Sequence, residues 1–403
     1  MWEFILGFID IFVLLDYIES RSEVWILNKK IRDYIDNNTE LLYKTLKELC
    51  LIPAPSHCEH ERAEYCKKWL ENHGAEGVYI DDALNVIFPI NCNSSDEITV
   101  FAAHTDTVFP DIEPMPYHDD GEKIFCPGAA DDTASVVILL MAAKYYIDNG
   151  KVPEDGLMFV LNSCEEGLGN LKGVRKLFED FQGRIKEFIT LDSVLDIVID
   201  RAVGSHRYEV IVTTEGGHSY NKFGNTNAIA VLSNIINAIY KIEVPQKEGS
   251  KTTYNVGVIE GGTSVNTIAQ SAKMLCEYRS DDKECLEFMS QEFNRIFDKA
   301  TQTAGVAVKM VGERPCADVD ILKMDDLKSK VVPVIEEILG KKVKLTSGST
   351  DCNIPVSLGI PAICIGTDIH EKTHTRQEWV DKESLKTGLE IALKTSMSLT
   401  KAE

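Results

Sequence analysis

The feature that most constrains the fold is an alternation of short apolar strands with helices in the first half of the chain. Strands are predicted at 77–81, 85–90, 98–104, 157–163 and 187–192, with helices at 132–148 and 170–182. Such alternation is typical of an α/β sheet joined by crossover helices. In an open sheet of this kind, ligands bind at the carboxyl ends of the strands.

The pattern changes after Gly204. The next elements are a strand at 207–214, a helix at 224–242, two strands within 252–280, a helix near 284–300 and a strand at 306–312. This order, β-α-β-β-α-β, is that of the ferredoxin-like split motif. We therefore expect a small domain inserted in a larger one, which resumes with a helix at 325–340 and a strand at 361–366. The expected boundaries are 27–205 and 315–403 for the large domain and 206–314 for the insertion.

The N-terminal residues 1–26 are expected to be a doubtful extension. Residues 2–15 are strongly apolar, but the stretch is shorter than the roughly 20 residues that cross a bilayer, and Glu3 and Asp10 interrupt it. It lacks the basic start and the small-residue cleavage site of a signal peptide. We favour a start codon assigned too early, with a docking helix or a weak membrane anchor as alternatives.

A helix is expected over 28–50, with a possible break at Asn37-Asn38-Thr39. After the IPAPS segment, Ser56 and Glu59 form a capping-box pattern at the start of a second helix, which Gly74 ends.

Charge and cysteine content narrow the class of protein. The net charge of −22 opposes binding to nucleic acid or to an anionic membrane surface, so neither is an expected partner. The eleven cysteines include no CxxC pair and are odd in number, which is typical of a reducing compartment. We therefore expect a cytoplasmic protein.

Side chains able to bind metal recur at the ends of the predicted strands. They are His104 and Asp106 in HTD, Asp131 in GAADD, Glu165 and Glu166 in EEG, Asp192 in EFITLD, and His374 in HTRQEW. Each alone has an ordinary structural explanation, such as a helix cap for Asp131 or a solvated loop for the glutamate pair. His370, close to His374, is expected to be a surface residue. Together, the two histidines and three of the carboxylates suit two zinc-like ions that share a bridging carboxylate, and cobalt or manganese is possible. This set consists of His104, Asp131, Glu166, Asp192 and His374.

The order of motifs resembles the family of peptidase T, carboxypeptidase G, aminoacylase and acetylornithine deacetylase. The motifs are HTD, GAADD, EEG, LDS, GGHS, CEYRS, GSTDCN and HTRQEW, and the similarity extends over residues 28 to 403. The resemblance implies a phosphorylase/hydrolase-like mixed-sheet catalytic domain with an inserted α+β ferredoxin-like lid domain. The sequence departs from the family pattern in reading Asp132-Thr133-Ala134 after the bridging aspartate.

The resemblance also implies roles for the site residues. One metal would be bound by His104 and Asp192, the other by Glu166 and His374, and Asp131 would bridge them. Glu165 would be the general base, and Asp106 would orient His104.

Three residues of the insertion are implied to bind substrate. His218 would reach the substrate carbonyl, often across a homodimer interface formed by the lid, and Arg279 would hold a substrate carboxylate. Asn266 would help to shape the pocket, together with the segment Ser349, Thr350 and Asp351.

The implied activity is hydrolysis of an amide bond by a metal-activated water, in a small peptide or an N-acyl amino acid. An aspartate at position 192 favours a di- or tripeptidase of the aminopeptidase type, because deacylase members of the family tend to have glutamate there. An N-acyl amino acid deacylase is the main alternative. Further alternatives are an inactive binding protein, a structural protein and a cysteine hydrolase using Cys164. A thiol beside carboxylates makes a poor nucleophile, which argues against the last of these.

Overall fold

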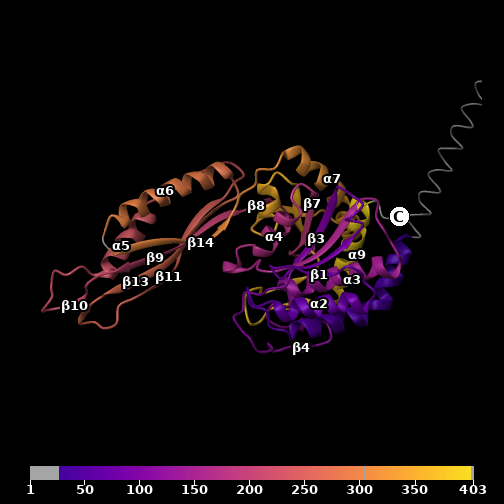
Figure 1. The fold of residues 1–403 in the computed structure, drawn as a ribbon, viewed down its shortest axis with the longest axis horizontal. Coiled ribbons are helices and arrows are strands. Elements are labelled where there is room, and N and C mark those ends of the chain that lie inside the picture. The colour runs from indigo at the N-terminus through magenta and orange to yellow at the C-terminus, as the bar shows by residue number, and fades with distance from the viewer. Residues whose placement is uncertain (1–26, 304, 401–403) are drawn as a thin grey trace, which may run out of the picture.

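The computed structural model describes residues 27–303 and 305–400, so the expected extension 1–26 lies outside the described residues. Figure 1 shows two bodies, a larger one built on a broad sheet and an elongated smaller one that projects from it. The larger body combines the early and the late parts of the chain, as the indigo, magenta and yellow segments show. The smaller body is formed by the middle of the chain.

The larger body contains an eight-stranded mixed sheet in the order β1-β2-β6-β3-β7-β16-β8-β15. These strands are β1 Tyr79–Ile80, β2 Val86–Ile90, β3 Ile98–His104, β6 Gly156–Asn162, β7 Ile185–Leu191, β8 Ile197–Ala202, β15 Lys344–Gly348 and β16 Ala362–Ile365. Strand β3 runs parallel to β6 and β7, whereas β2 pairs antiparallel with β6 and β8 with β16. The predicted mixed α/β sheet is therefore confirmed. Strands β8 and β15, near one edge, were not predicted.

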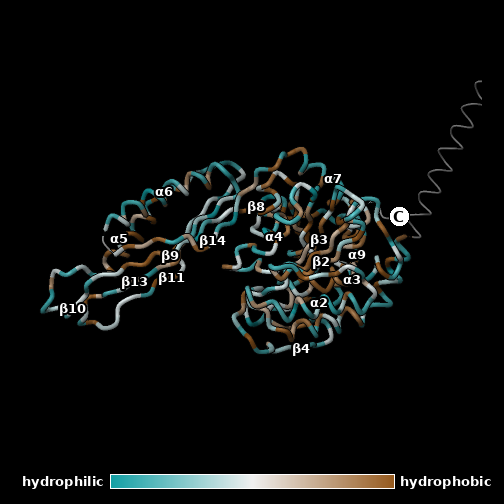
Figure 2. The backbone as a smooth tube through the Cα atoms, in the orientation of Figure 1, coloured by the Kyte–Doolittle hydropathy of each residue, from teal (hydrophilic) through white to brown (hydrophobic). Residues whose placement is uncertain are grey.

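Helices cover this sheet, and their apolar sides form the main core. They comprise a helix over residues 27–50, α2 His60–Asn72, α3 Ser135–Asp148, α4 Lys172–Asp180, α7 Ile321–Leu339, α8 Asn353–Ser357 and α9 Lys382–Thr400. Helix α3 is apolar almost throughout because it packs between β3 and α9. Figure 2 shows the apolar colouring concentrated on the central strands and the helices against them.

Two local predictions near the N-terminus were wrong. The helix continues through Asn38 and Thr39, whose side chains donate hydrogen bonds to the carbonyls of Tyr34 and Ile35, one turn earlier. No capping box forms at α2. Ser56 instead donates to Asp106, and the buried carboxylate of Glu59 accepts from the backbone amides of His57 and Cys164. Tertiary partners thus replaced the local ones.

The smaller body is built on a four-stranded antiparallel sheet in the order β11-β13-β9-β14. Its main elements are β9 Gly204–Thr213, α5 Ala228–Ile239, β11 Thr252–Gly261, β13 Ser271–Ser280, α6 Lys283–Thr301 and β14 Val306–Arg314. Helices α5 and α6 pack on the sheet and enclose a second hydrophobic cluster that includes Phe293 and Tyr278. The element order agrees with the predicted β-α-β-β-α-β pattern. A short antiparallel ribbon, formed by β10 Gly217–His218 and β12 Thr267–Ile268, extends from the distal end.

A third, small sheet connects the C-terminal HTRQEW motif with the loop before α3. It has the order β17-β18-β5-β4, formed by β4 His118–Asp119, β5 Lys123–Phe125, β17 His370–Glu371 and β18 Trp379–Asp381. Strand β18 pairs with β5, which leads directly into the segment 126–132. This pairing, absent from the sequence prediction, brings the two motifs together.

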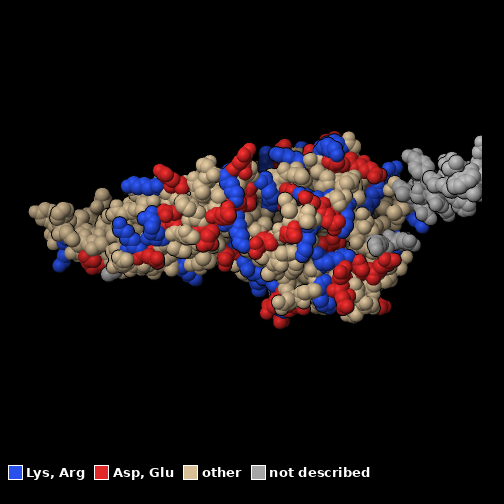
Figure 3. All heavy atoms as spheres, turned by 90° about the horizontal axis from the view of Figure 1, so that it is seen from above, with Lys and Arg blue, Asp and Glu red and all other residues tan. Residues whose placement is uncertain are grey.

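The described residues include no helix long and apolar enough to cross a membrane. Figure 3 shows acidic and basic side chains interleaved on the face in view, without a continuous basic patch.

Candidate metal centre and active site

The predicted metal-binding side chains come together at one edge of the central sheet. His104 ends β3, Glu165 and Glu166 follow β6, and Asp192 follows β7. The described residues contain three groups whose ligand atoms lie within 4.8 Å of one another: His104, Asp131 and Asp192; Asp131, Glu166 and His374; and His104, Glu165 and Glu166. A cavity of about 430 Å³ is lined by five of these residues, namely Asp131, Glu165, Glu166, Asp192 and His374, and also by Arg207, Arg279 and Arg314.

Asp131 lies between the two histidines and offers one oxygen to each. Its Oδ1 is 3.1 Å from Nε2 of His104, and its Oδ2 is 3.0 Å from Nε2 of His374. Nε2 of His374 is also 3.2 Å from Oε1 of Glu166. Two imidazoles and three carboxylates, with Asp131 common to both halves, form a donor set that fits two divalent ions. The residues present therefore fit the expected metal pair.

Glu378 holds the loop that carries Asp131. Its carboxylate accepts hydrogen bonds from the backbone amides of Gly128, Ala130 and Asp131, at 2.9, 2.8 and 3.0 Å. Gly128 has a φ of +76°, and a Cβ there would lie 2.5 Å from Thr107, so this turn requires glycine. Glu378 is buried, and it was not singled out from the sequence because its role depends on a backbone fold.

Asp132, the neighbour of Asp131, faces away from the centre. Its Oδ2 accepts a hydrogen bond of 2.9 Å from the backbone amide of His104. This arrangement favours Asp131 over Asp132 as the shared ligand and explains why a second aspartate follows the first.

Asp106 connects the first histidine to the glutamate pair. Nδ1 of His104 lies 3.1 Å from the Asp106 carbonyl oxygen and 3.4 Å from its Oδ1. The two carboxylate oxygens accept from the backbone amides of Glu165 and Glu166 at 2.9 and 3.0 Å, and Oδ2 also accepts from Ser56. Burial opposes ionisation of Asp106, but its hydrogen bonds lower its pKa below the usual value.

The charges of the cluster are incompletely compensated. Burial raises the pKa of Asp192 well above its usual value, and burial also raises the pKa of Glu166. The pKa of His374 is raised to about 10 by its bonds to Asp131 and Glu166. Burial opposes the charged form of His104, yet bonds to Asp106 and Asp131 raise its pKa well above the usual value. Such crowded buried carboxylates are what a pair of cations would neutralise.

Glu165 has a partner that the sequence did not reveal. Its Oε1 accepts a hydrogen bond of 2.8 Å from Nη1 of Arg314, which is the last residue of β14 and is buried. Arg314 belongs to none of the family motifs in the sequence, and the contact spans 149 positions. No local pattern pointed to it.

Of the three residues of the insertion that were predicted to bind substrate, only Arg279 lies at the cavity. Glu277 holds it there and also pairs with Arg207, with Nε–Oε distances of 2.8 and 3.3 Å. Ser349 and Thr350 line the same cavity. Asp351 is buried behind them and accepts a hydrogen bond from Asn162.

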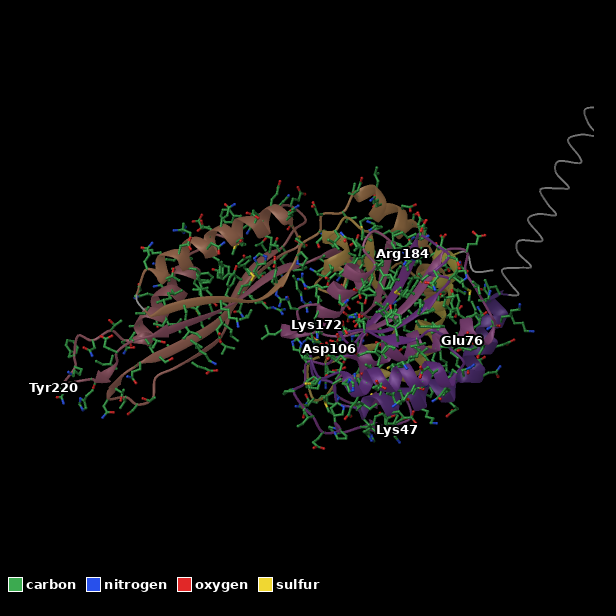
Figure 4. The ribbon with its side chains drawn as sticks, in the orientation of Figure 1. Lys47, Glu76, Asp106, Lys172, Arg184 and Tyr220 are labelled. Atoms are coloured by element: carbon green, nitrogen blue, oxygen red, sulfur yellow. The ribbon has the colours of Figure 1, made fainter. Side chains whose placement is uncertain are left out.

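His218 and Asn266 lie elsewhere. His218 is exposed in β10, and the backbone amide of Ser219 donates to the Asn266 carbonyl across the distal ribbon of β10 and β12. Figure 4 labels Tyr220 at the far tip of the smaller body and Asp106 in the larger body. Within one chain, the structure therefore does not bring these two residues to the cavity.

Two further predictions can be compared with the structure. The expectation of a surface His370 was wrong, because its side chain is only 14% exposed and its Nδ1 lies 2.5 Å from Oδ1 of the buried Asp368. Cys164 is buried beside Glu59, and burial raises its pKa to about 12, which agrees with a poor nucleophile. All eleven cysteines lie in the described residues and are free.

Comparisons with known proteins identify relatives of this chain. A protein from Schizosaccharomyces pombe with a peptidase M20 domain is 27% identical over 250 residues, which are 61% of this chain and 60% of that protein. An acetylornithine deacetylase from Myxococcus xanthus is 25% identical over 278 residues, 65% of this chain and 69% of its own. The solved structure of aminopeptidase PepT from Bacillus cereus has a TM-score of 0.67 at 22% identity, covering 90% of this chain and 99% of that one.

At 22% identity, the structural likeness shows the fold alone. The family profile described as peptidase family M20/M25/M40 matches residues 100–398, which include every residue of the metal-binding cluster. The match extends over most of the chain, so this protein belongs to the peptidase family M20/M25/M40 and is a hydrolase of the metallopeptidase and amidohydrolase type.

Proposed function

We propose that this protein is a zinc-dependent exopeptidase that removes amino-terminal residues from dipeptides or tripeptides. The observation that carries the proposal is the placement of Asp131, with one carboxylate oxygen toward each histidine, between two groups of ligands. This donor arrangement supports two metal ions held close together, and hydrolysis at such a pair is the chemistry of the family.

In this proposal His104 and Asp192 would hold one zinc, Glu166 and His374 would hold the other, and Asp131 would be shared by both. Cobalt or manganese would also suit these donors. When bound, the ions supply Lewis acidity and lower the pKa of water, which makes it a nucleophile near neutral pH.

The remaining chemistry belongs to the protein. Glu165 accepts the proton of the attacking water and then transfers it to the leaving nitrogen. Asp106 fixes the ring of His104 and, through the amides of Glu165 and Glu166, the position of the glutamate pair. Glu378 fixes the loop of Asp131.

The cavity is selective for substrates with a carboxylate. Arg279, held by Glu277, offers a planar pair of donors that suits the terminal carboxylate of a short peptide. The aspartate at position 192 favours the peptidase over the deacylase by family analogy. The Myxococcus relative, named as an acetylornithine deacetylase, supports N-acyl amino acid deacylation as the second candidate.

We further propose that two chains form a homodimer through the inserted lid, residues 206–314. The distal ribbon of β10 and β12 places His218 and Asn266 far from the cavity of their own chain. In the dimer they serve the cavity of the partner, where His218 stabilises the substrate oxyanion. Strand β11 is an unpaired edge of its sheet, and Ile259 on it is 56% exposed. Such an edge is a natural place for a second copy to pair. The proposed location is the cytoplasm.

The proposal is tested by hydrolysis of a panel of dipeptides, tripeptides and N-acetyl amino acids, before and after chelation and with zinc or cobalt restored. Metal-dependent release of amino-terminal residues from peptides supports the exopeptidase. Activity on acylated substrates alone would assign the deacylase instead. A protein that binds two metals and hydrolyses none of the panel would contradict both.

A further inference from the structure

Arg314 is the last residue of β14 and lies where the chain returns to the larger body. Its side chain is 5% exposed, and it reaches the loop that follows β6. Nη1 donates to Oε1 of Glu165 at 2.8 Å, and Nη2 donates to the backbone carbonyl of the same residue. Nη1 also lies within hydrogen-bond distance of Ser349, 3.1 Å from its Oγ and 3.2 Å from its carbonyl oxygen.

This contact holds one residue at two points. A glutamate side chain has several rotatable bonds, and a clamp on both its carboxylate and its main chain removes most of that freedom. In this clamped position, a carboxylate oxygen of Glu165 lies within 4.8 Å of ligand atoms of His104 and Glu166. The guanidinium therefore directs the carboxylate at the metal-binding cluster.

Stability alone does not account for this pair. Burying two charges carries a desolvation penalty, and apolar residues of similar volume are often equally stable or more stable in such a place. In addition, Nε of Arg314 has no hydrogen-bond partner among the described residues. A buried, partly unsatisfied arginine is better explained by what it does to Glu165.

Further hydrogen bonds join strands β9 and β14 of the inserted sheet to the loop that follows β6. The backbone amide of Glu313 donates to Oδ1 of Asn170 at 2.8 Å, and Arg175 donates to the Glu313 carbonyl at 2.7 Å. Arg207, on the adjacent strand β9, donates to the carbonyl of Gly167. The segment 165–170 is thus anchored to β9 and β14, so the small sheet and the glutamate pair form one connected unit.

We propose that Arg314 is a positioning residue for Glu165, which sets the carboxylate at the angle required for proton transfer and links its placement to that of the inserted sheet. The inference rests on the proposed function, since it assigns Glu165 the part of the general base. In this role Arg314 acts through Glu165.

The first test compares Arg314→Met and Arg314→Lys with the parent enzyme, using the peptide that the parent cleaves fastest. We expect kcat to fall about 100-fold in R314M, with KM and zinc content nearly unchanged, because a misplaced group costs about this much in rate. R314K, which keeps a charge but loses the fork, should recover part of kcat. The control is Arg295→Met, which removes an exposed arginine and its ion pair with Glu292 on α6.

The second test needs no activity. In metal-free protein, the unfolding midpoints of R314M, Glu165→Gln and the double variant form a double-mutant cycle. Non-additive shifts support the ion pair even if the parent hydrolyses nothing, in which case the proposed function alone fails. Additive shifts, an unchanged kcat in both variants, or a rise in KM at constant kcat would each overturn the positioning role. If R314M does not fold, R314K decides the outcome.

Discussion

At the residue scale, the candidate site is a set of mostly buried ionisable groups that shift one another's pKa values. His104 and His374 have raised pKa values because carboxylates surround them, while burial raises the pKa of Asp192 and Glu166. Protons therefore occupy, in the metal-free protein, positions that metal ions would take.

This balance predicts that zinc affinity increases with pH. The upward shifts mean that both histidines are protonated at neutral pH, and a metal must displace these protons. Between about pH 6 and about pH 8 the competing protons become scarcer, so the apparent Kd should fall. Calorimetry in buffers of different ionisation enthalpy measures the released protons. A Kd independent of pH would contradict the assignment of the two histidines as ligands.

The raised pKa of His374 also predicts how the stability of the metal-free protein changes with pH. The pKa of His374 is raised in the folded state, so protonation stabilises it fully below about pH 6.5, the unfolded value, and this stability is lost as pH rises through about 10. Thermal unfolding of chelated His374→Ala and parent protein should differ at low pH and converge at high pH. The side chain is 56% exposed, so solvent screening keeps the difference small.

Glu165→Gln should retain both metals and lose almost all turnover, since the amide cannot accept the proton of the attacking water. A loss of about 100-fold or more in kcat is expected, which is the usual contribution of a general base. Metal content by elemental analysis is the control. A variant that keeps most of its activity would remove Glu165 from the mechanism.

At the element scale, close approaches of backbone determine where the ligand loops lie. Helix α4 contacts the end of β6 through Gly173, where a Cβ would lie 2.5 Å from the carbonyl oxygen of Ser163. Ser163 stands two positions before Glu165, so this contact supports the glutamate pair from behind. The small sheet of β18 and β5 does the same for the Asp131 loop.

Gly173→Ala should therefore destabilise the protein and disturb the site together. Overpacking at such a contact costs about 2 kcal/mol, and the displaced segment should lower kcat as well. Denaturant unfolding and peptide hydrolysis measure the two effects. Lys172→Ala, at the exposed neighbouring position, is the control, and equal stability of the two variants would contradict the packing argument.

At the scale of the whole molecule, the feature that requires explanation is the separation between the distal ribbon of β10 and β12 and the cavity. In the proposed dimer, each site combines Glu165 of one chain with His218 of the other. A mixture of Glu165→Gln and His218→Ala proteins should then regain activity that neither has alone. Random pairing would restore about a quarter of parental activity, because half of the dimers carry one intact site. Failure of the mixture to regain activity, with dimers present by light scattering, would place His218 outside the site.

The sequence by itself determined the class of fold and the candidate metal ligands, which the structure brings together at one edge of the sheet. Alternating strands and helices report local periodicity, and the ligands occur in short motifs at strand ends, as for His104 in HTD and Glu166 in EEG. Both kinds of information lie within a few residues of one another, where backbone geometry already relates side chains.

The tertiary structure alone decided which distant groups support those ligands. Arg314 reaches Glu165 across 149 positions, Glu378 reaches the backbone of Asp131 across 247, and Ser56 bonds Asp106 in place of a helix terminus. Such contacts carry no sequence signature, because a buried arginine or glutamate can satisfy any polar group that the fold brings near it. The sequence motif also associated His218 with the cavity, but within one chain the fold places this residue in β10, away from the cavity, because a local motif does not determine which distant elements meet.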